Sequence, residues 1–158
     1  MEQKRAYFEE ALGALEKLYG RDVPMSLATA DGDRPNVRVI DVYFRDGAFY
    51  ATSHKNSNKM KEIAKNPHVA LNHELFVARG RAECLGHPNA PGNGALREEL
   101  MRVFSKFYSR HVDESDPGTC FLKIEPDWAL VFDGGCKYIA DFREKVSTRQ
   151  PFVADIIV

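Results

Sequence analysis

The sequence predicts a mainly β protein with helices inserted between its strands, folded as a barrel or a sandwich. Two observations lead to this class. Short stretches rich in β-branched and aromatic residues recur along the chain, and turn signals such as Asp31-Gly32, Asp46-Gly47 and Asp133-Gly134 separate them. Longer stretches carry apolar residues at helical spacing. Together they indicate about six or seven mostly antiparallel strands with helices between them.

The composition is that of one globular domain without a large charged surface. The chain has 158 residues, with 22 basic and 23 acidic side chains and a formal net charge of −1. Such a balance predicts no nucleic-acid partner. Three cysteines without C-x-x-C spacing, and a start that does not resemble a signal peptide, predict a cytoplasmic protein. No apolar run reaches about 18 residues, so we expect no membrane span.

The first predicted helix covers residues 2–19. One face carries its apolar residues, and Gly20 is a natural end. A strand follows over 25–30, then a hairpin whose strands cover 37–44 and 49–53 and whose two-residue turn is Asp46-Gly47. Ser57 can cap a second helix, which the Asn66-Pro67 pair ends.

The rest of the chain predicts four more strands and a helix. Strands are expected over 69–72, 75–85 and 120–132, where Gly80 marks a bend or a close backbone approach and Pro126 a bulge. A third helix is predicted over 95–108. A final strand covers 137–142. The remaining tail ends in the apolar residues 152–158, and we expect it to pack on its own barrel or on a partner subunit.

Arg38 is the most informative residue of the hairpin. Side chains alternate along a strand, so Arg38 shares a face with the apolar Ile40, Val42 and Phe44. A guanidinium on such a face requires an anionic partner.

The sequence leaves two kinds of anionic partner possible for Arg38. A phosphate could be held by Arg38, Thr52, Ser53 and Lys59, because Lys55 and Lys59 flank a helix start, where free N–H groups favour anions. Alternatively, Arg38 pairs with a carboxylate such as Asp41 or Glu83, and the lysines are solvated.

The order of residues between Pro35 and Leu71 resembles a known family. The pattern P-x-V-R-V-I, D-G-x-F-Y-A-T-S, S-N-K-x-x-x-I and N-P-x-V-A-L is similar to that of the pyridoxamine 5′-phosphate oxidase-like superfamily. The resemblance implies an FMN-binding split barrel, an antiparallel Greek-key barrel of about six to seven strands with peripheral helices. It covers roughly residues 1–142, which we expect to form the domain, with 143–158 as a C-terminal tail.

The resemblance also implies which residues bind the cofactor. Arg38 would hold the FMN phosphate, and the backbone of Val39 and Ile40 would lie against the flavin. The remaining candidates are Thr52, Ser53, His54 and Lys55 at the end of the return strand, and Asn58 and Lys59 at the helix start. Trp128, the only tryptophan, is either a core residue or a neighbour of the cofactor. The five histidines have no metal-ligand spacing, so no metal site is predicted.

The resemblance favours an FMN-dependent oxidoreductase that acts on a small-molecule redox substrate. The better match is to the small family members related to nitroimidazole reductases and general stress flavoproteins. It implies a homodimer with FMN at the interface. Residues 138–150, YIADFREKVSTRQ, lack the C-terminal motif of true pyridoxamine phosphate oxidases, so we do not expect vitamin B6 oxidation. Two alternatives stay open: a haem- or deazaflavin-binding split barrel, in which His54, His73 or His111 could ligate haem, and a non-enzymatic flavin-binding module.

Overall fold

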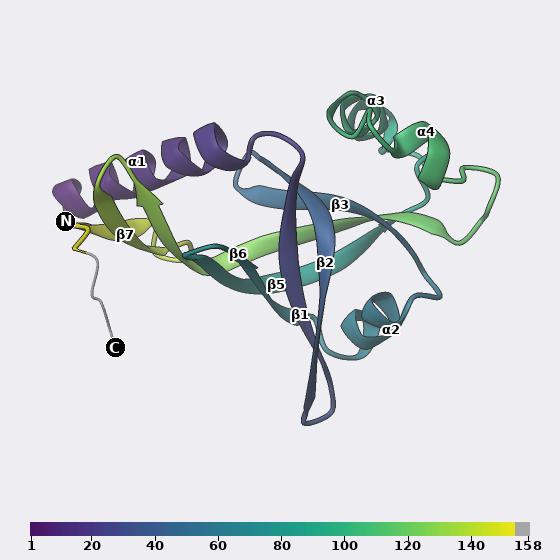
Figure 1. Cartoon of the computed structure of the whole chain (residues 1–158), viewed down its shortest axis with the longest axis horizontal. Coiled ribbons are helices and arrows are strands. Elements are labelled where there is room, and N and C mark those ends of the chain that lie inside the picture. Colours follow the sequence, from purple (N-terminus) through teal and green to yellow (C-terminus); the bar gives the residue numbers. More distant parts are fainter. Residues whose placement is uncertain (154–158) are drawn as a thin grey trace.

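The computed structural model describes residues 1–153, which form eight strands and four helices (Figure 1). The strands are β1 (Val23–Asp31), β2 (Arg34–Arg45), β3 (Ala48–His54), β4 (His68–His73), β5 (Phe76–Gly86), β6 (Thr119–Asp133), β7 (Cys136–Asp141) and β8 (Val146–Pro151). The helices are α1 (Glu2–Tyr19), α2 (Asn58–Lys65), α3 (Gly94–Val103) and α4 (Tyr108–His111).

Six of the strands close into an antiparallel barrel. The sheet order is β3-β2-β1-β4-β5-β6-β7-β8, and an additional pairing of β3 with β6 closes the first six strands on themselves. Strand β6 is 15 residues long and serves both parts, because its second half pairs with β7 outside the barrel. The predicted barrel is therefore confirmed, and the sandwich is excluded.

The two local devices predicted for the first hairpin and the second helix are present. Asp46 and Gly47 form the hairpin turn with φ of 49° and 84°, the positive values that a tight turn between twisted strands requires. The Ser57 side chain caps α2 by accepting a hydrogen bond from the Met60 N–H at 3.4 Å. These local choices position α2 directly after β3.

Gly80 lies at a close approach of β5 and β6, as its place in the strand predicted. The register of the two strands shifts between Arg79 and Gly80, where Gly80 faces Pro126. A Cβ atom added at Gly80 would lie 2.1 Å from the backbone oxygen of Glu125, so no side chain fits there. Beyond Pro126, β6 continues past the barrel and pairs with β7.

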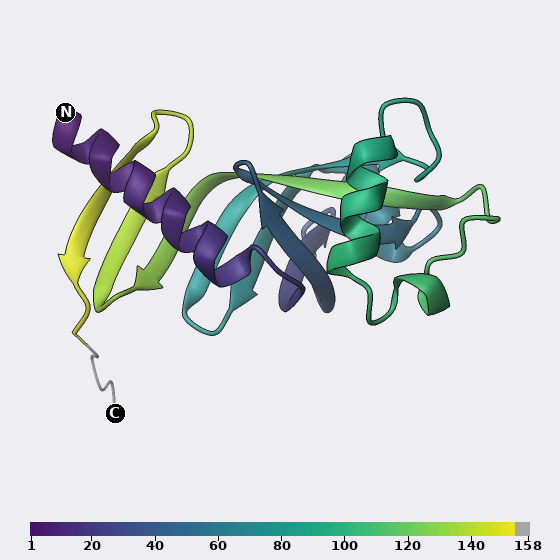
Figure 2. The ribbon, with the colours of Figure 1, turned by 90° about the horizontal axis from the view of Figure 1, so that it is seen from above.

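The barrel interior is filled by alternate residues of its strands, and α1 covers the end formed with β7 and β8 (Figure 2). The predicted apolar face of α1 is buried there through Phe8, Ala11, Leu15 and Tyr19. Helices α3 and α4 lie at the far end of the molecule from the N-terminus of α1 (Figure 2). They form a second apolar cluster, composed of Leu100, Phe104, Tyr108 and Phe121.

The prediction of one helix over 95–108 is wrong. The chain leaves the α-helix at Phe104, makes a turn and re-enters a short helix at Tyr108. The turn keeps Phe104 and Tyr108 buried in one cluster while the chain changes direction. Apolar spacing cannot show such a break, because the same residues face the core on either side of it.

Strand β8 was not predicted. Its sequence, VSTRQP, has no alternation of apolar and polar residues, because β8 is an edge strand held mainly by its pairing with β7. The ring of Phe152 packs on Phe132 at 4.9 Å. The rest of the apolar end, residues 154–158, lies outside the described residues. Within residues 1–153, no helix is long and apolar enough to cross a membrane.

Candidate functional site

The candidate site lies where α2 meets one end of the barrel. Arg38 is on the inward face of β2, as the alternation with Ile40, Val42 and Phe44 predicted. Its Nη1 atom donates to the backbone oxygen of Leu27 at 3.2 Å and to Thr29 Oγ1 at 2.6 Å. Both acceptors belong to β1, so the neighbouring strand orients the guanidinium toward α2.

The carboxylate partner of Arg38 is Glu62 of α2, not Asp41 or Glu83. Arg38 Nη2 lies 3.3 Å from Glu62 Oε2, and Asn36 donates to Glu62 Oε1 at 2.6 Å. The Thr29 hydroxyl also donates to Glu62 Oε2. These hydrogen bonds, that of Thr29 first, lower the pKa of Glu62, which is therefore a carboxylate at neutral pH. Asp41 points to the outer, exposed face of β2, which removes it from Arg38.

Lys59 brings a second cation to this end of the barrel. The side chain is half-buried, and both burial and the neighbouring Arg38 charge lower its pKa. It forms no ion pair within residues 1–153. An anion bound between Lys59 and Arg38 would relieve the repulsion between the two cations.

The N-terminus of α2 offers free donors beside these cations. The N–H groups of Asn58 and Lys59 donate to no backbone acceptor within residues 1–153, and the Ser57 side chain accepts from Met60 instead. Ser53 Oγ lies 3.5 Å from Ser57 Oγ, so β3 also contributes a hydroxyl here. The donor types that bind a phosphate monoester thus meet at this end of the barrel. We call this group of side chains the Arg38 centre; it consists of Arg38, Lys59, Ser53 and Ser57.

Thr52 and His54 lie on the opposite face of β3 from Ser53. They line a separate hollow of about 200 Å³ with the loop after α4, which contributes His111, Asp113 and Asp116. Strand alternation explains the separation, because Thr52 and His54 are each one residue away from Ser53. Ser53 alone reaches both places.

Both ring nitrogens of His54 are engaged. The Nδ1 atom accepts from the Asn56 N–H at 3.1 Å, which leaves the proton on Nε2, 2.9 Å from Asp116 Oδ2. The ring of His73 is bonded through Nδ1 to the Pro24 oxygen at 3.0 Å. Of the histidines considered as haem ligands, His54 is therefore held as a structural bridge between β3 and the loop after α4.

The other predicted residues surround this centre at different depths. Val39 is 67% exposed on the outer face of β2, whereas Ile40 is buried in the barrel. Lys55 is exposed, and its backbone N–H donates to Gly118. Asn58 lines a groove between α2 and the β1–β2 turn.

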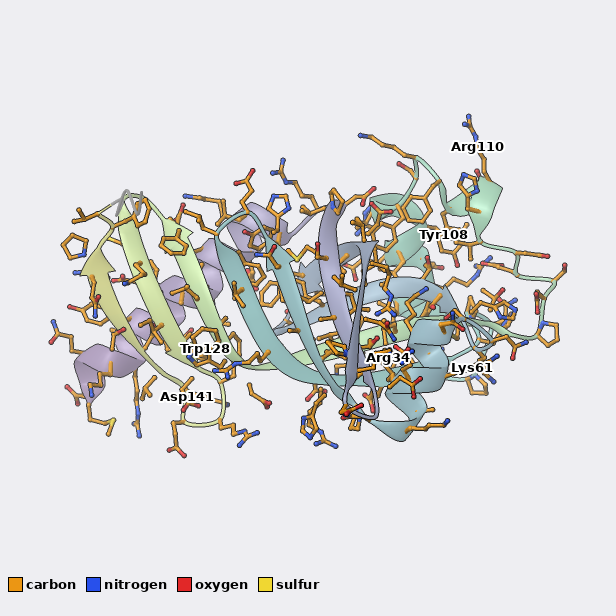
Figure 3. All side chains as sticks on the ribbon, turned by 60° about the horizontal axis from the view of Figure 1, so that its bottom comes forward. Arg34, Lys61, Tyr108, Arg110, Trp128 and Asp141 are labelled. Atoms are coloured by element: carbon orange, nitrogen blue, oxygen red, sulfur yellow. The ribbon has the colours of Figure 1, made fainter. Side chains whose placement is uncertain are left out.

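Trp128 is half-buried on the outer face of β6 and is not a core residue. The guanidinium of Arg79 stacks on its ring at 4.5 Å. Both side chains line a hollow of about 540 Å³ whose floor includes Ala28 and Ala70. Figure 3 shows Trp128 beside Asp141, well away from Arg34 and Lys61 near α2. Trp128 therefore belongs to a different surface from the Arg38 centre within one subunit.

Sequence reasoning missed Glu62 and Thr29. Glu62 is the only acidic residue of α2, NKMKEIAK, and this isolation is the one signal that could have singled it out. Thr29 carried no signal, because a threonine at an inward strand position is most simply a core residue.

The closed six-stranded barrel with two extra strands and four helices is a split barrel. The profile of the pyridoxamine 5′-phosphate oxidase family matches residues 12–132 of the chain. The chain therefore belongs to this family, as the pattern around Arg38 indicated. No curated protein matches the sequence.

Solved structures with the same fold cover most of the chain. A NimC/NimA family protein from Clostridium acetobutylicum matches with a TM-score of 0.57 at 19% identity, covering 96% of this chain and 100% of that one. An FAD-binding protein from Mesorhizobium loti matches at 0.60 and 25% identity, covering 75% and 91%. An F420 reductase matches at 0.54 and 21% identity, covering 72% and 94%.

Proposed function

We propose that this protein binds FMN at the Arg38 centre and is an oxidoreductase. The observation that carries the proposal is the meeting of Arg38, Lys59 and the free N–H groups of α2 at one end of the barrel. The family and its flavin- or deazaflavin-binding neighbours support a cofactor of this type. A single phosphate matches the size of the donor set, which favours FMN.

Each side chain of the centre has a definite task in this proposal. Arg38 has five N–H donors and uses three of them on Leu27, Thr29 and Glu62, so one on Nε and one on Nη2 stay open for phosphate oxygens. Lys59 adds a positive charge, and α2 adds its N–H groups. The backbone of Val39 and Ile40 would support the ring system. The flavin supplies the redox chemistry, and the chain binds and orients it.

The C-terminal strands support the exclusion of vitamin B6 oxidation. The two arginines of residues 138–150 are engaged within the chain. Arg149 lies 3.0 Å from Glu10 and stacks on the ring of Tyr7 at 4.5 Å. Arg143 lies 3.3 Å from Asp127. Each would have to leave its ion pair to hold the phosphate of a second substrate.

A homodimer is part of the proposal. Val37 and Val39 are 68% and 67% exposed on the outer face of β2. Neighbouring outer positions Ala28 and Ala70 form the floor of the hollow that contains Trp128. An apolar sheet face of this kind is normally covered by another chain. Val39→Asp should shift the mass measured by light scattering from dimer to monomer, and an unchanged mass would contradict the proposed interface.

We also propose the cytoplasm as the place of action. All three cysteines are free thiols, and burial raises the pKa of Cys120 to about 12, so this thiol stays protonated at neutral pH. Free thiols fit a reducing compartment.

The visible spectrum of the purified protein, with mass spectrometry of the released cofactor, tests the proposal. Oxidised-flavin bands and a released FMN mass are the expected result. Arg38→Ala and Lys59→Ala should each weaken FMN binding at least about tenfold, because a charge-assisted hydrogen bond to phosphate is lost. A colourless protein that takes up no added FMN would refute the cofactor. Reduction of bound flavin by a nicotinamide donor would separate an enzyme from a non-enzymatic flavin-binding module, and a Soret band would point to haem.

A further inference from the structure

A groove of about 640 Å³ runs beside the Arg38 centre, between α2 and the turn that joins β1 to β2. Figure 3 shows its two sides through Arg34 of the hairpin and Lys61 of the helix. On α2, the lining residues Asn58, Lys61, Glu62 and Lys65 follow the spacing of one helix face. We call this feature the hairpin groove.

The hairpin groove carries an excess of positive charge without partners. Arg34, Lys61 and Lys65 are exposed, and none of them forms an ion pair within residues 1–153. Two carboxylates, Asp31 and Glu62, also line the groove. The Glu62 charge is paired with Arg38, which leaves Asp31 as the one other lining carboxylate against three lining cations. The groove is therefore suited to an anionic group.

Glu62 and Asn58 connect the groove to the candidate phosphate site. One oxygen of Glu62 contacts Arg38 at 3.3 Å, and the other accepts from Asn36, which lines the groove. Asn58 lines the groove, while its backbone N–H belongs to the free donors of α2. The groove and the phosphate site therefore adjoin through Glu62, which contacts Arg38 and lines the groove.

We propose that the hairpin groove binds the second anionic group of a flavin that continues past its first phosphate, so that the protein accepts FAD as well as FMN. The inference rests on the proposed function, because it extends the same site. Arg34, Lys61 and Lys65 bind the distal phosphate of the diphosphate, and the amides at the groove wall face the remainder of the nucleotide. FMN ends at its single phosphate and makes no contact with these three cations.

Titration of flavin-free protein with FMN and with FAD, followed by flavin fluorescence, tests the proposal. The groove variant combines Arg34→Gln, Lys61→Gln and Lys65→Gln. The control combines Lys4→Gln, Arg5→Gln and Arg110→Gln, which removes the same charge from exposed, unpaired positions on α1 and α4. The groove variant should bind FAD at least about tenfold more weakly and FMN within about twofold, while the control changes neither.

Three results would overturn the inference. They are binding of FMN but not FAD by the parent protein, an equal loss of both flavins in the groove variant, and no loss of either flavin in that variant. In each of these the flavin site itself survives, so the proposed function stands. If the parent protein binds neither flavin, the proposed function fails and the groove proposal fails with it.

Discussion

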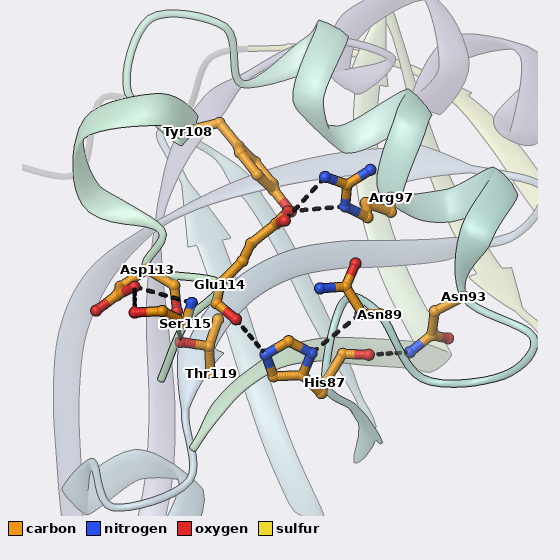
Figure 4. Close-up of polar contacts among 9 residues, drawn as sticks. All are labelled: His87, Asn89, Asn93, Arg97, Tyr108, Asp113, Glu114, Ser115 and Thr119. Carbon is orange, nitrogen blue, oxygen red and sulfur yellow. Dashed lines mark hydrogen bonds and ion pairs between the residues drawn. The ribbon is translucent and has the colours of Figure 1, made fainter. Parts of the chain in front are cut away.

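Two of the arginine–glutamate pairs that hold helices in place are built differently. Arg97 of α3 grips Glu114 with two parallel hydrogen bonds of 2.8 Å, and the Tyr108 hydroxyl donates to the same carboxylate at 2.9 Å (Figure 4). Arg38 of β2 touches Glu62 of α2 once, at 3.3 Å. The pairs have similar exposure, with side chains 31% and 24% exposed in the first and 25% and 12% in the second. The two pairs therefore differ in the geometry of their hydrogen bonds and not in their burial.

The difference shows which arginine is available to a ligand. Arg97 is the largest cause of the lowered pKa of Glu114, so that pair is self-contained. For Glu62 the largest cause is the Thr29 hydroxyl, and Arg38 contributes less. Both faces of the Arg97 fork are therefore used by its partner, whereas Arg38 keeps open donors beside Lys59, which forms no ion pair in the described part of the chain. A close bidentate pair indicates a structural role, and a loose pair beside free cations indicates a binding site.

The largest expected effect is on the Arg97–Glu114 pair, which we call the structural pair. Arg97→Ala leaves the partly buried Glu114 carboxylate with only Tyr108 as a side-chain donor, so Tm should fall by about 5–10 °C. FMN affinity should change by less than about twofold, because α2 is untouched. Thermal unfolding and flavin titration check both parts, with exposed Arg110→Ala as the control. A large loss of FMN affinity in Arg97→Ala would erase the distinction between the two pairs.

The next effect concerns the Arg38–Glu62 pair, which we call the loose pair. Glu62→Gln removes the negative charge that competes with phosphate for Arg38, while the amide oxygen can still accept from Asn36. FMN affinity should therefore rise about tenfold, which corresponds to about 1.4 kcal/mol. Flavin titration measures it, with Glu98→Gln on exposed α3 as a charge-matched control. An affinity that falls would mean that Glu62 positions Arg38 instead of competing for it.

A smaller effect is expected from the hydroxyl that completes the structural pair. Tyr108 is 4% exposed, and Tyr108→Phe keeps its ring in the second apolar cluster while removing the donor to Glu114. The loss should be about 1 kcal/mol, or about 2–4 °C in Tm, because Arg97 still holds the carboxylate. Tyr50→Phe, which removes a half-buried hydroxyl that has no hydrogen-bond partner within residues 1–153, serves as the control. No loss in Tyr108→Phe would show that the bidentate pair alone carries the stability.

The smallest effect is the pH dependence of the structural pair. The pKa of Glu114 is lowered in the folded protein, so the stability that it contributes is present above the ordinary glutamate pKa of about 4.3. It is lost as the pH falls through the lowered value. The Tm difference between the parent and Arg97→Ala should therefore shrink between about pH 5 and about pH 3. A difference that grows on acidification would contradict the assignment.

The sequence predicted much of this arrangement, for physical reasons that differ between residues. Arg38 on an inward strand face and Ser57 at a helix start follow from strand alternation and capping, which are local. The pairing of Arg97 with Glu114 was not predicted, because the two belong to a helix and to a loop that the predicted single helix 95–108 placed differently. The break at Phe104 turns the chain so that Tyr108 and Glu114 meet Arg97.

The sequence alone determined the barrel strands, the hairpin turn at Asp46-Gly47, the close approach at Gly80 and the inward direction of Arg38. Each depends on residues near one another in the chain or on a backbone conformation that few residues allow. The tertiary structure decided that Glu62 is the partner of Arg38, across 24 positions of sequence, and that Thr52 and His54 face another hollow. It also decided that β8 extends the sheet. These outcomes depend on long-range packing, in which several polar partners compete for the same group and only the folded geometry selects one.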